Sequence, residues 1–399
     1  AVGYRALDNN TADNNTAVGT DALKTNTTGN LNQSFGAFSL QANTEGVRNT
    51  AIGSYAMYDN TTGDHNVAVG QSALYNNETA DGNTAVGYVS LNANTTGANN
   101  TSVGKDSLKV NTTASNNVAV GFESLCKNTT GTCNVAVGKG ALKANLTTSE
   151  NTAVGTNSLN GNTGSCNTGV GASALENNTG DNNTAVGRRA LYLNTSGSGN
   201  TAVGRLTLDA NTTAAENTAM GNSALGSTTT GGSNSAFGSS ALVANTTGAT
   251  NVAVGIEALT ANTTASDNVA VGSCALKCNT TGANNIAVGA RALCTVTTGI
   301  KNIAIGTEAL RYNTGSNNTA IGYLSLDANT TASSNTAVGE SSLGANTTGV
   351  ENVAIGASAG AANTTGNLNT FVGRDAGQNN TTAGNNTFVG ERAGQANTT

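Results

Sequence analysis

The chain has 399 residues, of which only 10% are charged, its formal net charge is −6, and it contains neither Pro nor Trp. A weak charge spread over this length provides no basic stripe for nucleic acid, and no apolar run is long enough to span a bilayer. Asn, Thr, Ala and Gly dominate the composition, as in many disordered chains, but Val and Leu recur at fixed positions, which indicates an ordered repeat.

One pattern repeats from the first residue onward: N-T-A-V-G, two variable residues, A-L, two more variable residues and N-T-T-G. Its anchor glycine occurs 24 times between Gly3 and Gly390, at intervals of seventeen or, in four places, sixteen residues. This period is too short for helical repeats and fits one solenoid coil of two short strands and two turns. The sequence therefore predicts an all-β protein, a parallel β-solenoid or β-roll of about 24 coils.

The array occupies residues 1–399 as a single continuous region. It starts in mid-repeat at Ala1 and stops in mid-repeat at Thr399. We therefore expect it to be a fragment of a longer array, with contacts mainly between neighbouring coils.

Each coil is numbered here from its anchor glycine, which is position 0. Position −4 is Asn, and stacked coils place identical residues about 4.8 Å apart, so these side chains are expected to form a ladder of amides. The alternative is that each Asn caps only its own turn. The first members of this structural column are Asn15, Asn32, Asn49, Asn66, Asn83 and Asn100.

Positions −2 and −1 are a small residue followed by an apolar one, and positions +3 and +4 repeat this pattern as Ala or Ser followed by Leu. Adjacent residues of a strand point to opposite faces, so both faces of each strand are expected to be buried. A coil this small encloses little volume, so other chains would supply the second contact. The sequence thus predicts lateral association of identical chains, as a homotrimer.

The N-T-T corner that begins at position +7 matches the N-x-[ST] acceptor of N-glycosylation, or simply supplies turn residues. Candidate glycosylation sites at this corner include Asn26, Asn60, Asn94, Asn111, Asn128 and Asn262. Stacked Thr residues at +8 and +9 would also form a regular array of methyl and hydroxyl groups, which suggests an ice-binding surface as a further hypothesis.

Catalytic candidates are few. His65 is the only histidine and sits with Asp64 in a turn, where a surface role is expected. No glycine is followed by the lysine of a phosphate loop, and isolated acids such as Asp106 and Glu123 fit a solvated face. We therefore predict that the chain is not an enzyme and holds no cofactor or metal.

The six cysteines suggest two candidate disulfides. Cys126 and Cys133 flank the corner of one coil, and Cys278 and Cys294 lie one coil apart in nearly the same column. Neighbouring coils have the Cα separation that a disulfide needs, although free thiols fit the same positions. Disulfides would agree with an oxidising exterior.

Residues 351–399 contain variant coils in which Gly replaces the +4 Leu, at Gly360, Gly377 and Gly394. In the coils that follow the first two of these, the −2 Ala becomes Phe371 and Phe388. A large residue is lost at one position and gained eleven residues later, as expected if the two sites share one packed core. Position +4 of one coil is therefore predicted to contact position −2 of the next.

Residues 83–97 read NTAVGYVSLNANTTG, and this motif recurs along the whole chain. It resembles the head repeats of YadA-like trimeric autotransporter adhesins and, more closely, N-T-A-x-G-Y-x-A-L-x-x-N-T-T-G arrays of bacterial surface and phage fibre proteins. The resemblance implies a left-handed, trimeric, extracellular β-roll used for adhesion or as a spacer.

These observations favour a structural segment of an extracellular, cell-surface or virion-surface fibre, acting as a rigid shaft or an adhesive head. Its expected partners are identical chains, together with contact to a host surface or carbohydrate through positions +1, +2, +5 and +6. The alternative is a subunit of a self-assembling filament, with or without a glycan coat. Neither nucleic acid nor, in this segment, a membrane is an expected partner.

Overall fold

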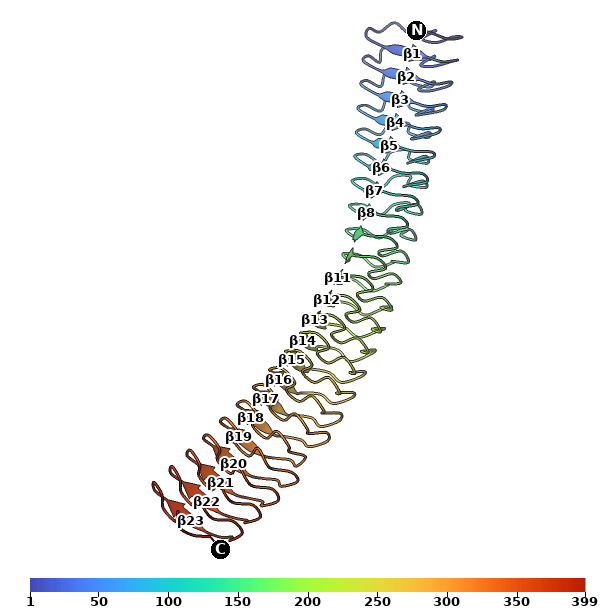
Figure 1. Ribbon diagram of the computed structural model, residues 1–399. Helices are drawn as coiled ribbons and strands as arrows, with labels where there is room; N and C mark the ends of the chain where they lie inside the picture. Colours follow the sequence, from blue (N-terminus) through green and yellow to red (C-terminus); the bar gives the residue numbers. More distant parts are fainter. Residues whose placement is uncertain (399) are drawn as a thin grey trace. The chain divides into compact units, whose positions relative to one another are not determined.

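The structure is a computed structural model that describes residues 1–398. Residue contacts divide the chain into two compact units, residues 1–199 and residues 200–399, and each is described by itself. Both units are parallel β-solenoids in which one coil is stacked on the next (Figure 1). The predicted fold class is confirmed at this level, because the described residues form about 22 complete turns and no helix.

Every strand has three residues, at positions −3 to −1 of its coil. The strands of the first unit are β1 (Thr16–Val18), β2 (Gln33–Phe35), β3 (Thr50–Ile52), β4 (Val67–Val69), β5 (Thr84–Val86), β6 (Thr101–Val103), β7 (Val118–Val120), β8 (Val135–Val137), β9 (Thr152–Val154), β10 (Thr168–Val170) and β11 (Thr184–Val186).

The strands of the second unit have the same length and position. They are β12 (Thr201–Val203), β13 (Thr218–Met220), β14 (Ser235–Phe237), β15 (Val252–Val254), β16 (Val269–Val271), β17 (Ile286–Val288), β18 (Ile303–Ile305), β19 (Thr319–Ile321), β20 (Thr336–Val338), β21 (Val353–Ile355), β22 (Thr370–Val372) and β23 (Thr387–Val389).

Strands in consecutive coils pair in parallel and in register, so that equivalent positions lie side by side. Ala17 of β1 is opposite Ser34 of β2, for example, and Ala253 of β15 is opposite Ala270 of β16. The first anchor glycine has no strand before it, because only two residues precede it; there an isolated bridge joins Val2 to Val18. The coil count taken from the anchor glycines is therefore slightly higher than the number of complete turns.

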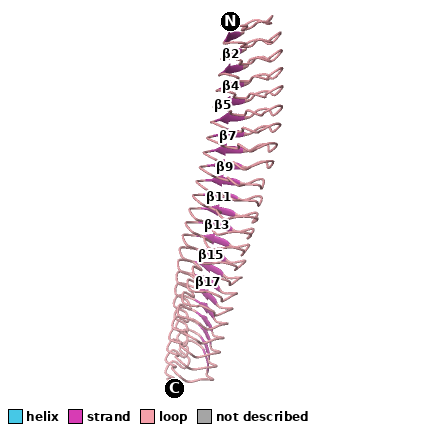
Figure 2. Ribbon diagram, turned by 90° about the vertical axis from the view of Figure 1, so that its right-hand side faces the viewer, coloured by secondary structure: helices cyan, strands magenta, loops and turns pink. Residues whose placement is uncertain are grey.

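The prediction of two strands in each coil is wrong. Figure 2 shows strands along only one side of the coils, with turns making up the rest. The A-L pair after the anchor glycine belongs to a turn in which the Leu has a positive φ, 51° at Leu23 and 50° at Leu276. A left-handed residue cannot continue a β-strand, and its N–H points to the following coil: that of Leu23 donates to Ser39 O at 3.0 Å.

The core of each coil is formed by positions −2, +3 and +4. The −2 residue of nearly every strand is fully buried, whereas the apolar −1 residue on the opposite face is half-buried or exposed, with 39% exposure at Phe35 and 42% at Ile52. The two faces of the strand therefore differ within one chain: the interior buries one, and the other stays partly accessible to solvent.

Position +4 contacts position −2 of the next coil, as the variant coils predicted. A Cβ placed on Gly360 would lie 2.5 Å from Cδ2 of Phe371. The same contact occurs in the first unit, where Gly169 replaces the −2 Ala and a Cβ there would lie 3.2 Å from Cγ of Leu159. The two positions share one volume, so a larger side chain at one requires a smaller one at the other.

The anchor glycine is required by its conformation and by its neighbour. Gly255 has φ +134°, and a Cβ there would lie 2.6 Å from the carbonyl oxygen of Gly272 in the next coil. No side chain fits in that space, which explains why the residue at position 0 recurs without exception.

The difference between sixteen- and seventeen-residue coils is located at the N-T-T corner. In a longer coil the +7 Asn side chain donates to the carbonyl three residues ahead, as Asn60 does to Gly63 O at 3.1 Å. In a shorter coil it donates to the carbonyl two residues ahead, as Asn178 does to Gly180 O at 2.6 Å. One amide thus closes the corner at both lengths.

Candidate functional site

The side chains that vary from coil to coil are carried by positions +1, +2, +5 and +6, which we call the variable face. The +3 and +4 side chains between them point into the core, so the variable residues are left at the surface. Backbone hydrogen bonds hold the columns in line: N–H of Glu123, at +2, donates to the carbonyl of Lys105, at +1 of the preceding coil, at 3.1 Å.

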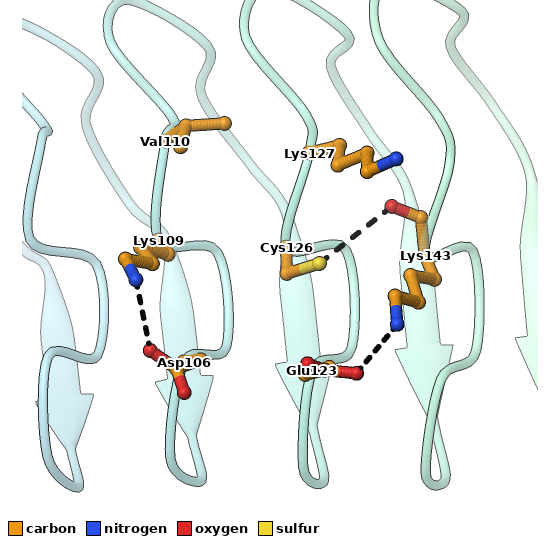
Figure 3. Close-up of a pocket in the computed structure, with 7 residues that line it drawn as sticks. All are labelled: Asp106, Lys109, Val110, Glu123, Cys126, Lys127 and Lys143. Atoms are coloured by element: carbon orange, nitrogen blue, oxygen red, sulfur yellow. Dashed lines mark hydrogen bonds and ion pairs between the residues drawn. The ribbon is translucent and has the colours of Figure 1, made fainter.

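A groove of about 470 Å³ opens on the variable face of the first unit. It is lined by side chains from the three consecutive coils that follow β6, β7 and β8, shown in Figure 3: Asp106, Lys109, Val110, Glu123, Cys126, Lys127 and Lys143. Three lysines and two carboxylates make this lining positively charged.

Two ion pairs lie along the groove. Nζ of Lys109 is 3.2 Å from Oδ1 of Asp106 in the same coil. Nζ of Lys143 is 2.7 Å from Oε2 of Glu123 in the preceding coil, because Gly140 occupies the +2 position of its own coil and offers no carboxylate. The hydrogen bond to Glu123 raises the pKa of the Lys143 ammonium. Lys143 is therefore a cationic group and not a candidate base.

Cys126 lies between the two ion pairs. Its thiol is 3.8 Å from the carbonyl oxygen of Lys143, and burial, followed by the charge of Glu123, raises its pKa. A thiol in this state is mostly protonated at neutral pH and is a poor nucleophile. The groove can hold an anion by charge, but it contains no activated nucleophile.

Aromatic rings gather on the variable face nearer the start of the same unit. Phe38 stacks on Tyr55 with ring centroids 4.9 Å apart, and Tyr58 stacks on Tyr75 at 5.0 Å. The two pairs meet where Tyr55 approaches Tyr58 at 5.7 Å. This cluster gives the face an apolar, partly exposed region several coils before the groove.

The groove was not predicted from the sequence, although the sequence contains a signal for it. The positive charge of the groove comes from lysines at +5 and +6 of successive coils. The net charge of the whole chain is weakly negative and therefore does not reveal this local concentration. Asp106 and Glu123 were expected to be isolated, solvated acids; the structure pairs each with a lysine.

The −4 Asn column is buried and forms bonds between coils. Oδ1 of Asn32 accepts the backbone N–H of Asn49 in the next coil at 2.9 Å, and the Nδ2 of Asn32 donates to Gly46 O at the N-T-T corner of its own coil at 2.8 Å. The same backbone bond continues through Asn66, Asn83 and Asn100, while Asn15 at the start of the column is half-buried. These side chains therefore connect neighbouring coils; they do not cap only their own turn.

The +7 Asn column forms the more regular amide ladder. Nδ2 of Asn60 donates to Oδ1 of Asn43 at 2.7 Å and also to the carbonyl of its own corner. The six candidate glycosylation sites are all fully buried: Asn26, Asn60, Asn94, Asn111, Asn128 and Asn262. Their amides are occupied, so the folded chain offers no accessible nitrogen for a sugar at these positions.

The Thr column beside this ladder also forms bonds between coils. Oγ1 of Thr27 donates to Thr44 O at 3.0 Å, and Oγ1 of Thr61 donates to Glu78 O at 2.9 Å. These hydroxyl hydrogens are already bonded within the fold, which weakens the case for an ice-binding array.

His65 is exposed, and its Nε2 lies 3.3 Å from Nη1 of Arg48 in the preceding coil. The six cysteines are free thiols in the structure, including Cys126 and Cys133. Cys278 and Cys294 are backbone neighbours, with the N–H of Cys278 donating to Cys294 O at 3.1 Å. Their placement in adjacent coils agrees with the expected geometry, and no bond joins the two sulfurs in this structure.

Within residues 1–398 no group of three or more His, Cys, Asp or Glu side chains is arranged to hold a metal ion. The part of the chain that the structure describes also has no helix long and apolar enough to cross a membrane. No protein-family model matches the chain. A search of curated proteins likewise finds no match.

Proposed function

We propose that this chain is a structural segment of an extracellular fibre, in which it serves as a rigid shaft or an adhesive head. The observation that supports the proposal is that nearly the same side chains fill the interior of successive coils. Repeated Ala, Leu and Asn side chains fill most of the coils, and the variation between coils is concentrated at the surface. A chain built in this way can be extended coil by coil and can display different side chains along its length.

Lateral association as a homotrimer forms part of the proposal. The strand face opposite the core carries a column of exposed apolar residues, including Val18, Phe35 and Ile52 in the first unit and Met220 and Phe237 in the second. A continuous apolar column of this kind favours contact with other chains, and a second copy carries the same column at the same spacing. The left-handed coil and the extracellular setting rest on the resemblance of the repeat to surface and fibre arrays.

The test is the assembly state of the purified chain, measured by analytical ultracentrifugation and negative-stain electron microscopy. We expect finite needles with three times the mass of the chain. Replacing three residues of the exposed column with Ser, as in Val18→Ser, Phe35→Ser and Ile52→Ser, should shift the mass toward one chain without unfolding it. Indefinite fibrils would instead support the self-assembling filament, and a monomeric chain would contradict the trimer.

A further inference from the structure

The lysines of this chain are concentrated in one place. Five of the eight lysines in the sequence occur between residues 105 and 143: Lys105, Lys109, Lys127, Lys139 and Lys143. All five are at positions +1, +5 or +6, so they belong to the variable face of three consecutive coils in the first unit. We call them the lysine cluster. In a chain with a net charge of −6, they reverse the local charge.

The cluster contains more positive charge than its ion pairs neutralise. Its only acidic neighbours on the variable face of these coils are Asp106 and Glu123. Lys109 and Lys143 pair with them, and Nζ of Lys105 is 3.9 Å from Asp106. Within residues 1–398, Lys127 and Lys139 form no ion pair, and both are exposed. Five cations and two anions leave a local charge of +3.

The coils on either side carry no charge at these positions. The variable face before the cluster consists of Tyr88, Val89, Asn92 and Ala93, and the face after it consists of Thr156, Asn157, Asn160 and Gly161. The positive charge is therefore bounded along the stack, and a ligand that follows it would contact three coils in succession.

Aromatic rings alternate with lysines in the +1 column. Tyr88, Lys105, Phe122 and Lys139 occupy this position in four consecutive coils. Nζ of Lys105 lies 5.9 Å from the ring centroids of both Tyr88 and Phe122. Tyr88 is 50% exposed and Phe122 is 40% exposed, so each offers apolar surface beside a cation.

We propose that the lysine cluster binds a linear acidic polysaccharide that runs along the stack of coils. This inference deepens the adhesive role proposed above and rests on it in one respect, that the variable face is displayed outside the cell. Lysine ammonium groups at repeated coil spacing fit a chain with repeated carboxylate or sulfate groups, and the exposed rings fit the apolar faces of sugars.

The same residues fit nucleic acid less well. No Arg lies between residues 105 and 143, so the planar, bidentate donors that favour phosphate are missing. Asp106 and Glu123 lie inside the cluster and would repel a backbone as densely charged as DNA. A net charge of +3 confined to three coils fits a more sparsely charged polymer.

The test is binding of the purified chain to polygalacturonate and dextran sulfate, with neutral dextran as the reference polymer, measured by isothermal titration calorimetry. We expect both acidic polymers to bind, neutral dextran to show no binding, and affinity to fall as salt is raised. The variant Lys109→Gln/Lys127→Gln/Lys143→Gln should lose about tenfold or more in affinity for the acidic polymers.

The chain supplies a matched control, because three lysines lie outside the cluster. The variant Lys24→Gln/Lys277→Gln/Lys301→Gln removes the same total charge and should bind within about twofold of the parent chain. Phe122→Ser should weaken binding of polygalacturonate while leaving binding of inorganic polyphosphate unchanged. Circular dichroism of each variant checks that the solenoid remains folded.

Equal losses in the two triple variants, or no binding of either acidic polysaccharide, would overturn the proposal. Tighter binding of duplex DNA or of anionic phosphatidylserine vesicles at the same salt concentration would also overturn it. These outcomes are separable from the fibre proposal, which depends on mass and electron microscopy of the unliganded chain. If the chain forms trimeric needles but does not bind acidic polysaccharide, only the ligand proposal is refuted. If the chain is a monomer that binds acidic polysaccharide, only the fibre proposal is refuted.

Discussion

The two ends of the second unit fill the same core with different side chains. In the coils that follow β13 to β20 the interior is formed by Ala at −2 and Leu at +4, as with Ala253 and Leu259. In its last coils Phe371 occupies the −2 position and Gly360 and Gly377 the +4 position, and Phe371 stacks on Phe388 with centroids 5.8 Å apart. The backbone is the same in both regions. What the repeat conserves is therefore the volume shared by neighbouring coils, and not the residue at a given position.

The largest expected effect is one that both regions share. Gly255→Ala and Gly373→Ala should each destabilise the fold by about 4 kcal/mol or more, because the new Cβ combines a positive φ with a backbone clash. That Cβ would lie 2.6 Å from Gly272 O in the first case and 2.5 Å from Gly390 O in the second. Urea unfolding followed by circular dichroism measures the loss.

Gly344→Ala is the control for both substitutions. Gly344 is at position +5, has no positive φ, and is replaced by larger residues in most coils. Its substitution should change stability by less than about 1 kcal/mol. If Gly255→Ala and Gly373→Ala differed greatly in the stability they cost, the two ends of the second unit would differ in backbone as well as in core packing.

The second prediction exchanges one core pattern for the other. Phe371→Ala alone should cost about 3 to 4 kcal/mol, because it leaves a cavity beside Gly360 and Gly377. Adding Gly360→Leu restores the Ala–Leu pair of the earlier coils and should recover more than half of that loss. Unfolding free energies of the two single variants and of the double variant measure the coupling.

If the changes in unfolding free energy from the substitutions at positions 360 and 371 were additive, the two positions would not share one core volume. The informative control is Gly360→Leu on its own, which should destabilise by about 1 to 3 kcal/mol through overpacking against Phe371.

The third prediction extends the comparison to the polar column. Val296 interrupts the +7 ladder, and Oδ1 of Asn279 in the preceding coil is buried without a hydrogen-bond partner in the described structure. Val296→Asn should supply that partner and stabilise the chain by about 1 to 2 kcal/mol. Differential scanning calorimetry measures the change in Tm.

The reverse substitution is the matched control. Asn262→Val in an unbroken part of the ladder should lower Tm, because Asn262 donates to Asn245 Oδ1 at 2.9 Å and to Ala265 O at 3.0 Å. If both substitutions lower Tm, the ladder does not stabilise the fold in the way described.

The smallest effect is expected at the surface, where one ion pair sets a carboxyl pKa. A hydrogen bond from Lys277 lowers the pKa of Glu257, with Nζ and Oε2 2.7 Å apart. The pair therefore adds stability above the ordinary pKa of Glu, and this contribution is lost as pH falls through the lowered pKa of the folded state. Lys277→Met should return the pKa of Glu257 to the usual range in an NMR titration, whereas Lys301→Met should leave it unchanged.

Much of the fold could be predicted from the sequence, because the repeat aligns equivalent residues. The spacing of the anchor glycines predicts the length of one coil. The paired substitutions at Gly360 and Phe371 predict the contact between positions +4 and −2 of neighbouring coils. The second strand could not be excluded, since a Leu at positive φ costs local energy and has no sequence signature. Its conformation is maintained by a hydrogen bond from the Leu N–H to the following coil, as from Leu40 to Ala56 O, and this contact is not visible in the sequence of a single coil.

The site was harder to predict because its contacts cross coils. Glu123 and Lys143 are twenty residues apart in sequence, and the stacking of neighbouring coils brings Nζ of Lys143 to 2.7 Å from Oε2 of Glu123. The burial of the +7 Asn side chains was also hard to predict, because it depends on which positions of the coil stack in the interior. The N-x-[ST] matches mark accessible corners in many proteins, but here the stacked amides fill the space between coils.

The corner that closes at two lengths indicates how such an array can change over generations. A single-residue deletion elsewhere in the coil would move every following side chain to the wrong face, whereas at this corner the Asn amide bonds a carbonyl either two or three residues ahead. Insertions and deletions that the fold tolerates are therefore expected to be single residues at this corner or whole coils. Unequal recombination between near-identical repeats could then lengthen or shorten the protein without altering the fold of the coils that remain.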